Sequence, residues 1–177
     1  MNKLKYYYVK LLSKIKKEKT KETVNKYFRK CGIKIGKQCN ICSDIVTSEP
    51  YLIEIGSNVT IGGHVELITH DNSISKIMPE KTDLFGKIVI GDNCFVGARS
   101  IILYGVTLKK NIIVASGSVV TKSFFEENII IGGNPAKKIG NWNEFKLQKG
   151  KYALNITDLS LEERKIVELD ENNLIKR

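Results

Sequence analysis

The chain has 177 residues, of which 42% are hydrophobic and 27% are charged, as in an average globular protein. This composition excludes an intrinsically disordered chain and a small disulfide-rich protein, and no apolar run approaches the roughly 18 residues of a membrane-spanning helix. The net charge of +10 is concentrated in residues 1–30, which carry 11 basic and 2 acidic side chains, against 18 and 17 in the remainder. This uneven distribution argues against a nucleic-acid partner, because the remainder supplies no matching basic surface.

The first 30 residues predict one or two amphipathic helices whose polar positions are mostly lysine. Nothing in this segment has the apolar core or the small-residue cleavage site of a secretory signal, so we expect a cytoplasmic protein. Two sets of apolar residues recur at helical spacing, the first made of Leu4, Tyr8, Leu11, Leu12 and Ile15, and the second of Val24, Tyr27 and Phe28.

A hydrophobic repeat with a period of six residues follows this segment. It begins at Ile35 and Ile41 and resumes at Ile55, and the 14-residue step between the last two indicates a two-residue insertion around 48–50. A helix would need a period of 3.6 residues, so the repeat predicts a solenoid of triangular coils with three hexapeptides per turn. Its clearest part is the aliphatic series Ile90, Val96, Ile102, Leu108, Val114 and Val120.

The third position after each of these aliphatic residues predicts a corner between short strands. Asparagine and glycine are common there, and both tolerate a positive φ. The fourth position is often small, and Cys39 and Cys94 occupy it, so we expect them to be buried structural residues. Redox or metal chemistry at the Cys39–Cys42 pair is the alternative, but no second such pair exists. The predicted corners are Asn93, Arg99, Gly105, Asn111 and Gly117.

Two breaks in the pattern divide the chain. Residues 71–87 are polar, contain Pro79 and interrupt the repeat, and loops of this length are usually functional. Beyond the repeat, Ser160 and Glu163 form the pattern of a capping box, which predicts a short helix near 160–170. We therefore expect a helical segment at 1–30, a mainly β domain at 31–140 that carries the loop, and a C-terminal extension at 141–177.

The chain contains only two histidines, His64 and His70, and each lies three residues after an aliphatic residue of the repeat. His70 directly precedes the loop at 71–87, where a neutral imidazole can take a proton from an attacking hydroxyl group. Asp71 or a backbone carbonyl is expected to orient the second ring nitrogen. For His64 we expect a structural role.

The ordered motifs at 88–98, 105–107, 116–122 and 133–139, together with Thr69–Asp71, resemble the C-terminal half of galactoside and maltose O-acetyltransferases. They are also similar to acetyltransferases of capsule and lipopolysaccharide assembly, all within the hexapeptide-repeat acyltransferases. The resemblance covers residues 33–140. It implies a left-handed parallel β-helix, although general crossover statistics favour the right hand. It further implies acetyl-CoA as donor, no metal, and a homotrimer with active sites between subunits.

The resemblance also implies roles for individual residues. His70 corresponds to the general base, the backbone amides of Ala98 and Ser116 to contacts with the pantetheine arm, and Asn40 and Asp71 to acceptor contacts. Phe95 stands where many relatives carry tryptophan, and Lys137 where galactoside-type enzymes carry arginine. The remaining residues of the implied coenzyme A channel are Thr121, Lys122 and Pro135, with Lys137 near the phosphates.

These expectations lead to an acetyl-CoA-dependent O-acetyltransferase of a sugar hydroxyl on a glycan, a polysaccharide precursor or a nucleotide sugar. The alternatives are N-acetylation of an amino sugar or nucleotide amino sugar, and a noncatalytic trimeric scaffold. A carbonic anhydrase of the same fold needs three zinc-binding histidines, and this chain has two. Residues 1–30 are expected to bind the inner face of the membrane, to bind a partner enzyme of glycan assembly, or to pack on the trimer.

Overall fold

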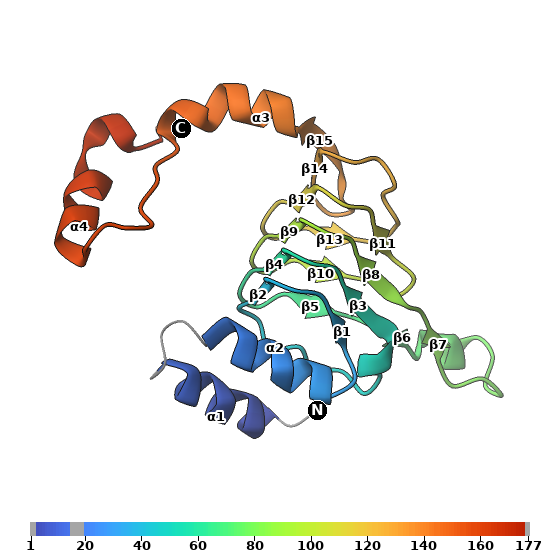
Figure 1. The fold of residues 1–177 in the computed structure, drawn as a ribbon. Coiled ribbons are helices and arrows are strands. Elements are labelled where there is room, and N and C mark those ends of the chain that lie inside the picture. Colours follow the sequence, from blue (N-terminus) through green and yellow to red (C-terminus); the bar gives the residue numbers. More distant parts are fainter. Residues whose placement is uncertain (1–2, 15–19, 176–177) are drawn as a thin grey trace. The chain divides into compact units, whose positions relative to one another are not determined.

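The computed structural model describes residues 3–14 and 20–175. The chain divides into two compact units, Met1–Ile139 and Gly140–Arg177, which are described separately. The first unit contains two helices, α1 (Lys3–Lys14) and α2 (Thr20–Lys30), followed by the solenoid (Figure 1). Within the described residues, no helix has both the length and the apolar character needed to cross a membrane.

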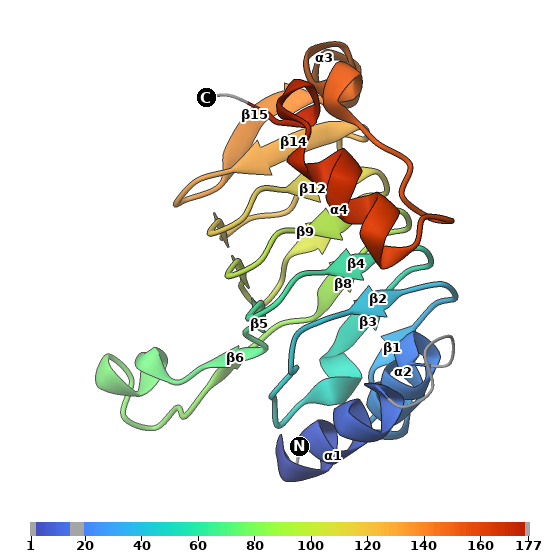
Figure 2. The same ribbon diagram turned by 90° about the vertical axis from the view of Figure 1, so that its left-hand side faces the viewer.

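The solenoid is a parallel β-helix whose coils stack short strands into three sheets, which hold four, six and three strands within the described residues. The first sheet contains β1 (Lys34–Ile35), β3 (Ile53–Ile55), β8 (Ile88–Ile90) and β11 (Thr107–Leu108). The second contains β2 (Asn40–Ile41), β4 (Thr60–Ile61), β9 (Phe95–Val96), β12 (Ile112–Val114), β14 (Ile129–Gly132) and β15 (Lys137–Asn141). The third contains β5 (Glu66–Leu67), β10 (Ile101–Ile102) and β13 (Val119–Val120). Figure 2 shows the coils stacked along the axis.

The aliphatic residues of the six-residue repeat form the core of this β-helix, as predicted. Val96, Ile102 and Val114 have no exposed surface, because each side chain points inward and packs between the coils on either side. All five predicted corners have positive φ, between 56° and 78°. Cys39 and Cys94 are buried, as expected, and the Cys94 thiol lies 3.1 Å from the Lys109 carbonyl oxygen.

A ladder of asparagine side chains runs along one line of corners. The amide nitrogen of Asn58 donates to Asn93 Oδ1 at 2.7 Å, that of Asn93 to Asn111 at 2.8 Å, and that of Asn111 to Asn128 at 2.9 Å. All four residues have positive φ. Asparagine therefore serves twice here, since it tolerates the left-handed backbone and links neighbouring coils.

We expect Asn93→Ala to lower the free energy of unfolding by about 2–3 kcal/mol, because two side-chain hydrogen bonds are lost and alanine is strained at positive φ. Asn93→Gly loses the same hydrogen bonds without the strain, so its loss should be smaller. Urea denaturation at fixed protein concentration measures both. Equal losses for the two variants would contradict the backbone part of this explanation.

The N-terminal helices cover the first coil. Val24, Tyr27 and Phe28 of α2 are buried, as predicted, and Arg29 joins the helix to the first sheet by donating to the Ile35 carbonyl oxygen at 2.8 Å. In α1 the inward residue is Tyr6, which is 3% exposed and lies 5.5 Å from Phe28 between ring centroids.

The apolar face predicted for the first helix is not the face that packs. Leu4, Tyr8 and Leu11 are 81%, 61% and 62% exposed, whereas Tyr6 is buried. Tyr6 packs inward because the aromatic rings of Tyr27 and Phe28 in α2 lie beside it. The helical spacing alone did not predict this contact. Ile15 and the Leu12 side chain, which belonged to the predicted face, lie outside what the structure describes.

The second unit contains α3 (Trp142–Lys149) and α4 (Leu161–Leu169). The predicted capping box is confirmed, because Ser160 accepts from the Glu163 amide while the Glu163 carboxylate accepts from the Ser160 amide. Helix α3 was not predicted from the residue pattern, and it begins where the Asn141 side chain accepts from the Glu144 amide at 3.0 Å. The second unit also contains short 3₁₀ helices at Gly150–Tyr152 and Glu171–Asn173. Two further 3₁₀ helices, at Pro50–Leu52 and Ser73–Lys76, belong to the first unit.

Candidate active site

The loop between β5 and β8 is a hairpin that leaves the β-helix at His70 (Figure 1). Its strands β6 (His70–Asp71) and β7 (Leu84–Phe85) pair antiparallel, with His70 opposite Phe85. The two rings lie 6.0 Å apart between centroids, and the Gly86 amide returns the chain to the β-helix by donating to the Thr69 carbonyl oxygen at 3.0 Å. His70 therefore begins a strand, whereas His64 occupies a corner with φ of 58°.

A buried carboxylate holds the His70 ring. Nδ1 of His70 lies 2.8 Å from Oε2 of Glu49, and Glu49 is only 8% exposed. The same oxygen accepts from the Thr69 hydroxyl at 2.7 Å and from the Thr47 hydroxyl at 3.3 Å. Oε2 thus receives hydrogen bonds from two hydroxyl groups and faces the imidazole.

Glu49 is ionised in this environment. Burial alone would raise the pKa of Glu49, but the hydrogen bonds from Thr69 and His70 outweigh it and hold the pKa below its ordinary value. An ionised carboxylate only accepts hydrogen bonds, so we assign the proton of the neutral imidazole to Nδ1. The lone pair is then on Nε2, the nitrogen on the far side of the ring. The His70 side chain is 43% exposed, which leaves the ring accessible to a substrate.

The expectation that Asp71 or a backbone carbonyl orients His70 was wrong. The Asp71 carboxylate accepts instead from the Ser73 amide at 2.7 Å and from the Tyr104 hydroxyl at 3.1 Å. The bond from the Ser73 amide is the main reason why the pKa of Asp71 lies below its ordinary value. Asp71 thus fixes the start of the hairpin, next to His70.

The two-residue insertion found in the sequence is what brings Glu49 to His70. Glu49 precedes the 3₁₀ turn Pro50–Leu52, where the coil departs from the regular repeat. Paired residues of the first two coils are 20 positions apart, as for Asn40 and Thr60. The same step back from Thr69 leads to Glu49, so counting one coil would have placed Glu49 beside Thr69, but it would not have shown the contact with the His70 ring.

Further candidate residues share an edge of the β-helix with His70. This histidine edge comprises the segments that lead from the third sheet to the first, at 69–71, 103–105 and 121–123. The register pairs Leu67 with Ile102 and Ile102 with Val120. Thr121 and Lys122 therefore lie on the same edge as His70, two coils further along the β-helix. Both are exposed, and Lys122 Nζ lies 5.8 Å from the centre of the Phe124 ring.

A second group of predicted residues lies on another edge. Ala98, Ser116 and Pro135 follow β9, β12 and β14, which are neighbours in the second sheet, so they lie along the edge between the second and third sheets. We call this the Ala98 edge. All three residues are exposed. Gly97 allows the close stacking here, because a Cβ atom at this position would lie 2.4 Å from the Ser116 nitrogen.

The outer face of the second sheet carries Phe95 and Asn40 in one column. Asn40 pairs with Thr60, and Thr60 pairs with Phe95, which is 45% exposed. Lys137 is exposed at the start of β15 in the same sheet. One chain therefore presents the acid–base pair, together with Asp71, Thr121 and Lys122, on the histidine edge. The remaining predicted contacts lie on the Ala98 edge or the second sheet, and the third sheet separates the two edges.

Within residues 3–14 and 20–175, the cysteines and acidic residues form no comparable centre. Burial is the main cause that raises the pKa of Cys94 to about 11, which leaves its thiol protonated. Across the described ranges, no three side chains among histidine, cysteine, aspartate and glutamate are arranged to hold a metal ion. The contact between His70 and Glu49 is an arrangement that can perform acid–base chemistry.

Comparison with known proteins shows the family to which this chain belongs. The family model for the hexapeptide repeat of succinyl-transferase matches residues 87–122. Protein CapG of Staphylococcus aureus is 41% identical over 144 residues, which are 78% of this chain and 83% of CapG. The chain belongs to the hexapeptide-repeat acyltransferases.

Other relatives of this acyltransferase have named activities. Galactoside O-acetyltransferase of Escherichia coli is 27% identical over 114 residues, which are 64% of this chain and 56% of that protein. A hexapeptide-repeat acetyltransferase from Vibrio cholerae, crystallised with acetyl coenzyme A, matches with a TM-score of 0.56 and 27% identity over 63% of this chain and 61% of that one. The predicted class of enzyme, an acyltransferase, and the predicted fold, a left-handed parallel β-helix, are thereby confirmed.

Proposed function

We propose that this acyltransferase moves the acetyl group of acetyl-CoA to a hydroxyl group of a sugar, with His70 as general base. The observation that carries this proposal is the contact between His70 Nδ1 and the buried Glu49 carboxylate at 2.8 Å. This contact leaves Nε2 free to accept a proton at an exposed position beside a hairpin. An imidazole held in this way is suited to general base catalysis near neutral pH.

The proposed reaction needs one proton acceptor and no further reactant. The sugar oxygen attacks the thioester carbonyl carbon while its proton passes to Nε2 of His70. The tetrahedral intermediate then collapses, the carbon–sulfur bond breaks, and the leaving sulfur takes the proton back from the imidazolium. The products are the acetyl ester of the sugar and coenzyme A with a free thiol, and His70 is again neutral. The ionised Glu49 stabilises the imidazolium while it exists.

Acetyl-CoA is supported as the donor by the chemistry of the exposed residues and by the Vibrio cholerae relative that was crystallised with it. Ala98 and Ser116 have small side chains, so a thin pantetheine arm can approach their backbone amides. Phe95 offers an exposed aromatic face. Lys122 and Lys137 are exposed, and ammonium groups suit the phosphates of coenzyme A as point charges.

A sugar is proposed as the acceptor on two grounds. One is the chemistry of the Asn40 and Asp71 side chains, and the other is the similarity to galactoside O-acetyltransferase. The Asn40 amide and the Asp71 carboxylate can both bind sugar hydroxyl groups, and each is partly exposed. A mass-spectrometric screen with acetyl-CoA and a panel of galactosides, glucosides, N-acetylhexosamines and nucleotide amino sugars tests this proposal. We expect a product whose acetyl group is released by hydroxylamine, as an ester is. A hydroxylamine-resistant acetyl amide would show N-acetylation instead.

We further propose a homotrimer in which each active site combines the histidine edge of one subunit with the Ala98 edge of another. Within one chain these edges are separated by the third sheet, so a donor held at Ala98 and Ser116 is not presented to His70 of the same chain. Cyclic association brings unlike surfaces of identical subunits together. Such an arrangement lets a neighbouring chain supply the missing half of each site.

Mixed assembly tests this arrangement. His70→Ala and Ser116→Trp should each be inactive alone, the first without a base and the second with the donor path blocked. When the two variants are unfolded together and refolded in equal amounts, random assembly should restore about a quarter of the wild-type activity. The control is a mixture of separately refolded variants, which should stay inactive. No recovery in co-refolded assemblies of the correct mass would place each site within one chain.

A further inference from the structure

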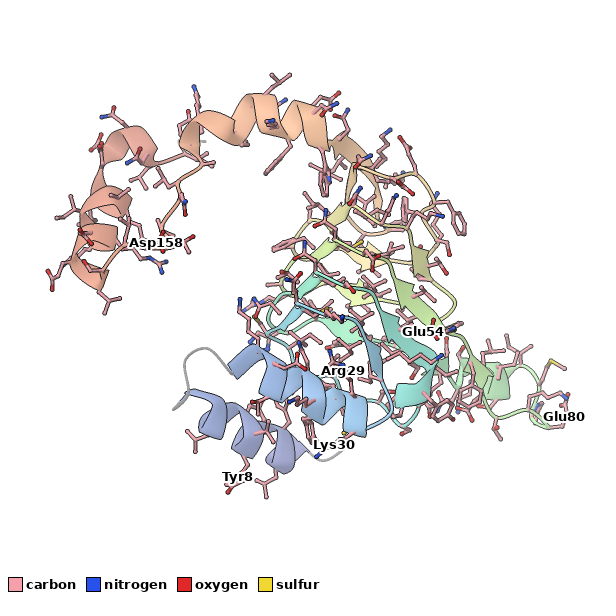
Figure 3. The ribbon with its side chains drawn as sticks, viewed as in Figure 1. Tyr8, Arg29, Lys30, Glu54, Glu80 and Asp158 are labelled. Atoms are coloured by element: carbon pink, nitrogen blue, oxygen red, sulfur yellow. The ribbon has the colours of Figure 1, made fainter. Side chains whose placement is uncertain are left out.

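The outward face of α1 carries large apolar side chains from Leu4 to Leu11. Leu4 and Leu11 are 81% and 62% exposed, and Tyr7 and Tyr8 are 54% and 61% exposed. Figure 3 shows Tyr8 pointing away from α2 and the β-helix. Soluble proteins rarely leave such a continuous apolar strip open to water, and strips of this kind usually mark a contact surface. We refer to these four residues as the α1 face.

The α1 face is not the surface that attaches the helix to the protein. Tyr6 makes that attachment on the opposite side, where it is 3% exposed and contacts the rings of Tyr27 and Phe28. Val9 is partly buried against the same core. The helix therefore has one apolar side packed inward and a second apolar side presented outward.

The N-terminal segment that carries this face is strongly basic. Residues 1–30 carry 11 basic and 2 acidic side chains. Four of the lysines belong to α1 itself, at positions 3, 5, 10 and 14. In α2, Lys21, Lys26 and Lys30 are exposed. Figure 3 shows Lys30 near the end of α2 that joins the first coil. The partner must therefore offer an apolar layer and negative charge together.

We propose that the α1 face binds the surface of an anionic lipid bilayer. Leucine side chains enter the boundary of the acyl chains, tyrosine rings suit the interface between apolar and polar layers, and lysines attract acidic headgroups. A helix of 12 residues lies in the plane of such a surface. A second copy of this segment is a poor partner, because it would carry the same excess of positive charge.

Flotation of the full-length protein with vesicles tests the proposal. One set of vesicles contains only phosphatidylcholine, and the other contains phosphatidylcholine mixed with phosphatidylglycerol. We expect binding to the anionic vesicles to be at least about tenfold tighter and to weaken as sodium chloride is added, because salt screens the lysines. The Tyr8→Gln/Leu11→Gln variant should bind anionic vesicles at least about tenfold more weakly than wild type.

A matched control separates this face from exposed apolar residues in general. Leu147 and Leu161 are 84% and 85% exposed in the second unit, so the Leu147→Gln/Leu161→Gln variant should bind vesicles as wild type does. Circular dichroism and acetyl transfer without vesicles should be unchanged in the Tyr8/Leu11 variant. Equal binding by that variant and wild type, or no preference for anionic vesicles, would overturn the proposal. If wild type ignores vesicles and the variant has a smaller assembly mass, the α1 face is a subunit interface instead.

Discussion

Replacing His70 by alanine should lower the turnover number of acetyl transfer by about 10²–10⁴-fold, the range for loss of a general base. The imidazole is 43% exposed and lies outside the aliphatic core, so the fold should survive. The affinity for coenzyme A should also be unchanged, because His70 is not among the residues proposed to hold the donor. Steady-state kinetics with the acceptor identified by the screen measure the loss, and calorimetric titration measures coenzyme A binding.

The second histidine provides the matched control for this variant. His64 occupies a corner with φ of 58°, where asparagine is tolerated. His64→Asn should therefore keep turnover close to that of wild type. A His70→Ala enzyme with near-wild-type turnover would contradict the proposed base, and a comparable loss in His64→Asn would show that histidine changes act through the fold.

Replacing Glu49 by glutamine should lower the turnover number by about 10–100-fold while the Michaelis constant for acetyl-CoA stays unchanged. Glutamine keeps the shape and an oxygen for the Thr69 hydroxyl, but it removes the negative charge that stabilises the His70 imidazolium. Glu49 touches no substrate in this scheme and acts as a positioning residue. A turnover number within a factor of two of wild type would contradict this role.

A spectroscopic measurement separates positioning from a general structural effect. The chain has only two histidines, so the ring nitrogens of His70 can be assigned by nitrogen-15 NMR with the His64→Asn variant as reference. In wild type, we expect the proton of the neutral ring on Nδ1. In Glu49→Gln, the shifts of both ring nitrogens should change. An unchanged His70 spectrum would mean that Glu49 does not orient the imidazole.

The lowered pKa of Glu49 also predicts the pH dependence of stability. Because the folded-state pKa lies below the unfolded value, ionisation of Glu49 stabilises the fold above the ordinary carboxyl pKa of about 4.3. This contribution is lost as the pH falls through the lower folded-state value. The difference in melting temperature between wild type and Glu49→Gln should therefore be larger at neutral pH than near pH 3.

The β-helix was predictable because its physical rule is local and repeats. Each inward position needs an aliphatic side chain, and each corner needs a residue that tolerates positive φ, so Val96 and Asn93 can be assigned from spacing alone. The capping box at Ser160 is equally local, since both partners lie within four residues. These features depend on neighbours in sequence or on a constant period.

The features that were missed depend on irregular contacts between coils or elements. Glu49 reaches His70 across one coil, at a point where an insertion breaks the period. The side of α1 that packs inward is determined by its contacts with the rings of Tyr27 and Phe28. The helical spacing instead predicted the face of Leu4, Tyr8 and Leu11, which is exposed. Asp71 was next to His70 in sequence, but strand geometry directs its carboxylate to Tyr104.

The decisive measurement is thiol release from acetyl-CoA by wild type and His70→Ala with the acceptor panel present. Coenzyme A binding is measured on the same preparations. Wild type should release thiol with at least one sugar acceptor, and His70→Ala should lose this activity by about 10²-fold or more while both proteins bind coenzyme A equally well. Wild type that neither binds coenzyme A nor releases thiol with any acceptor would show that this protein is not an acetyl-CoA-dependent sugar acetyltransferase.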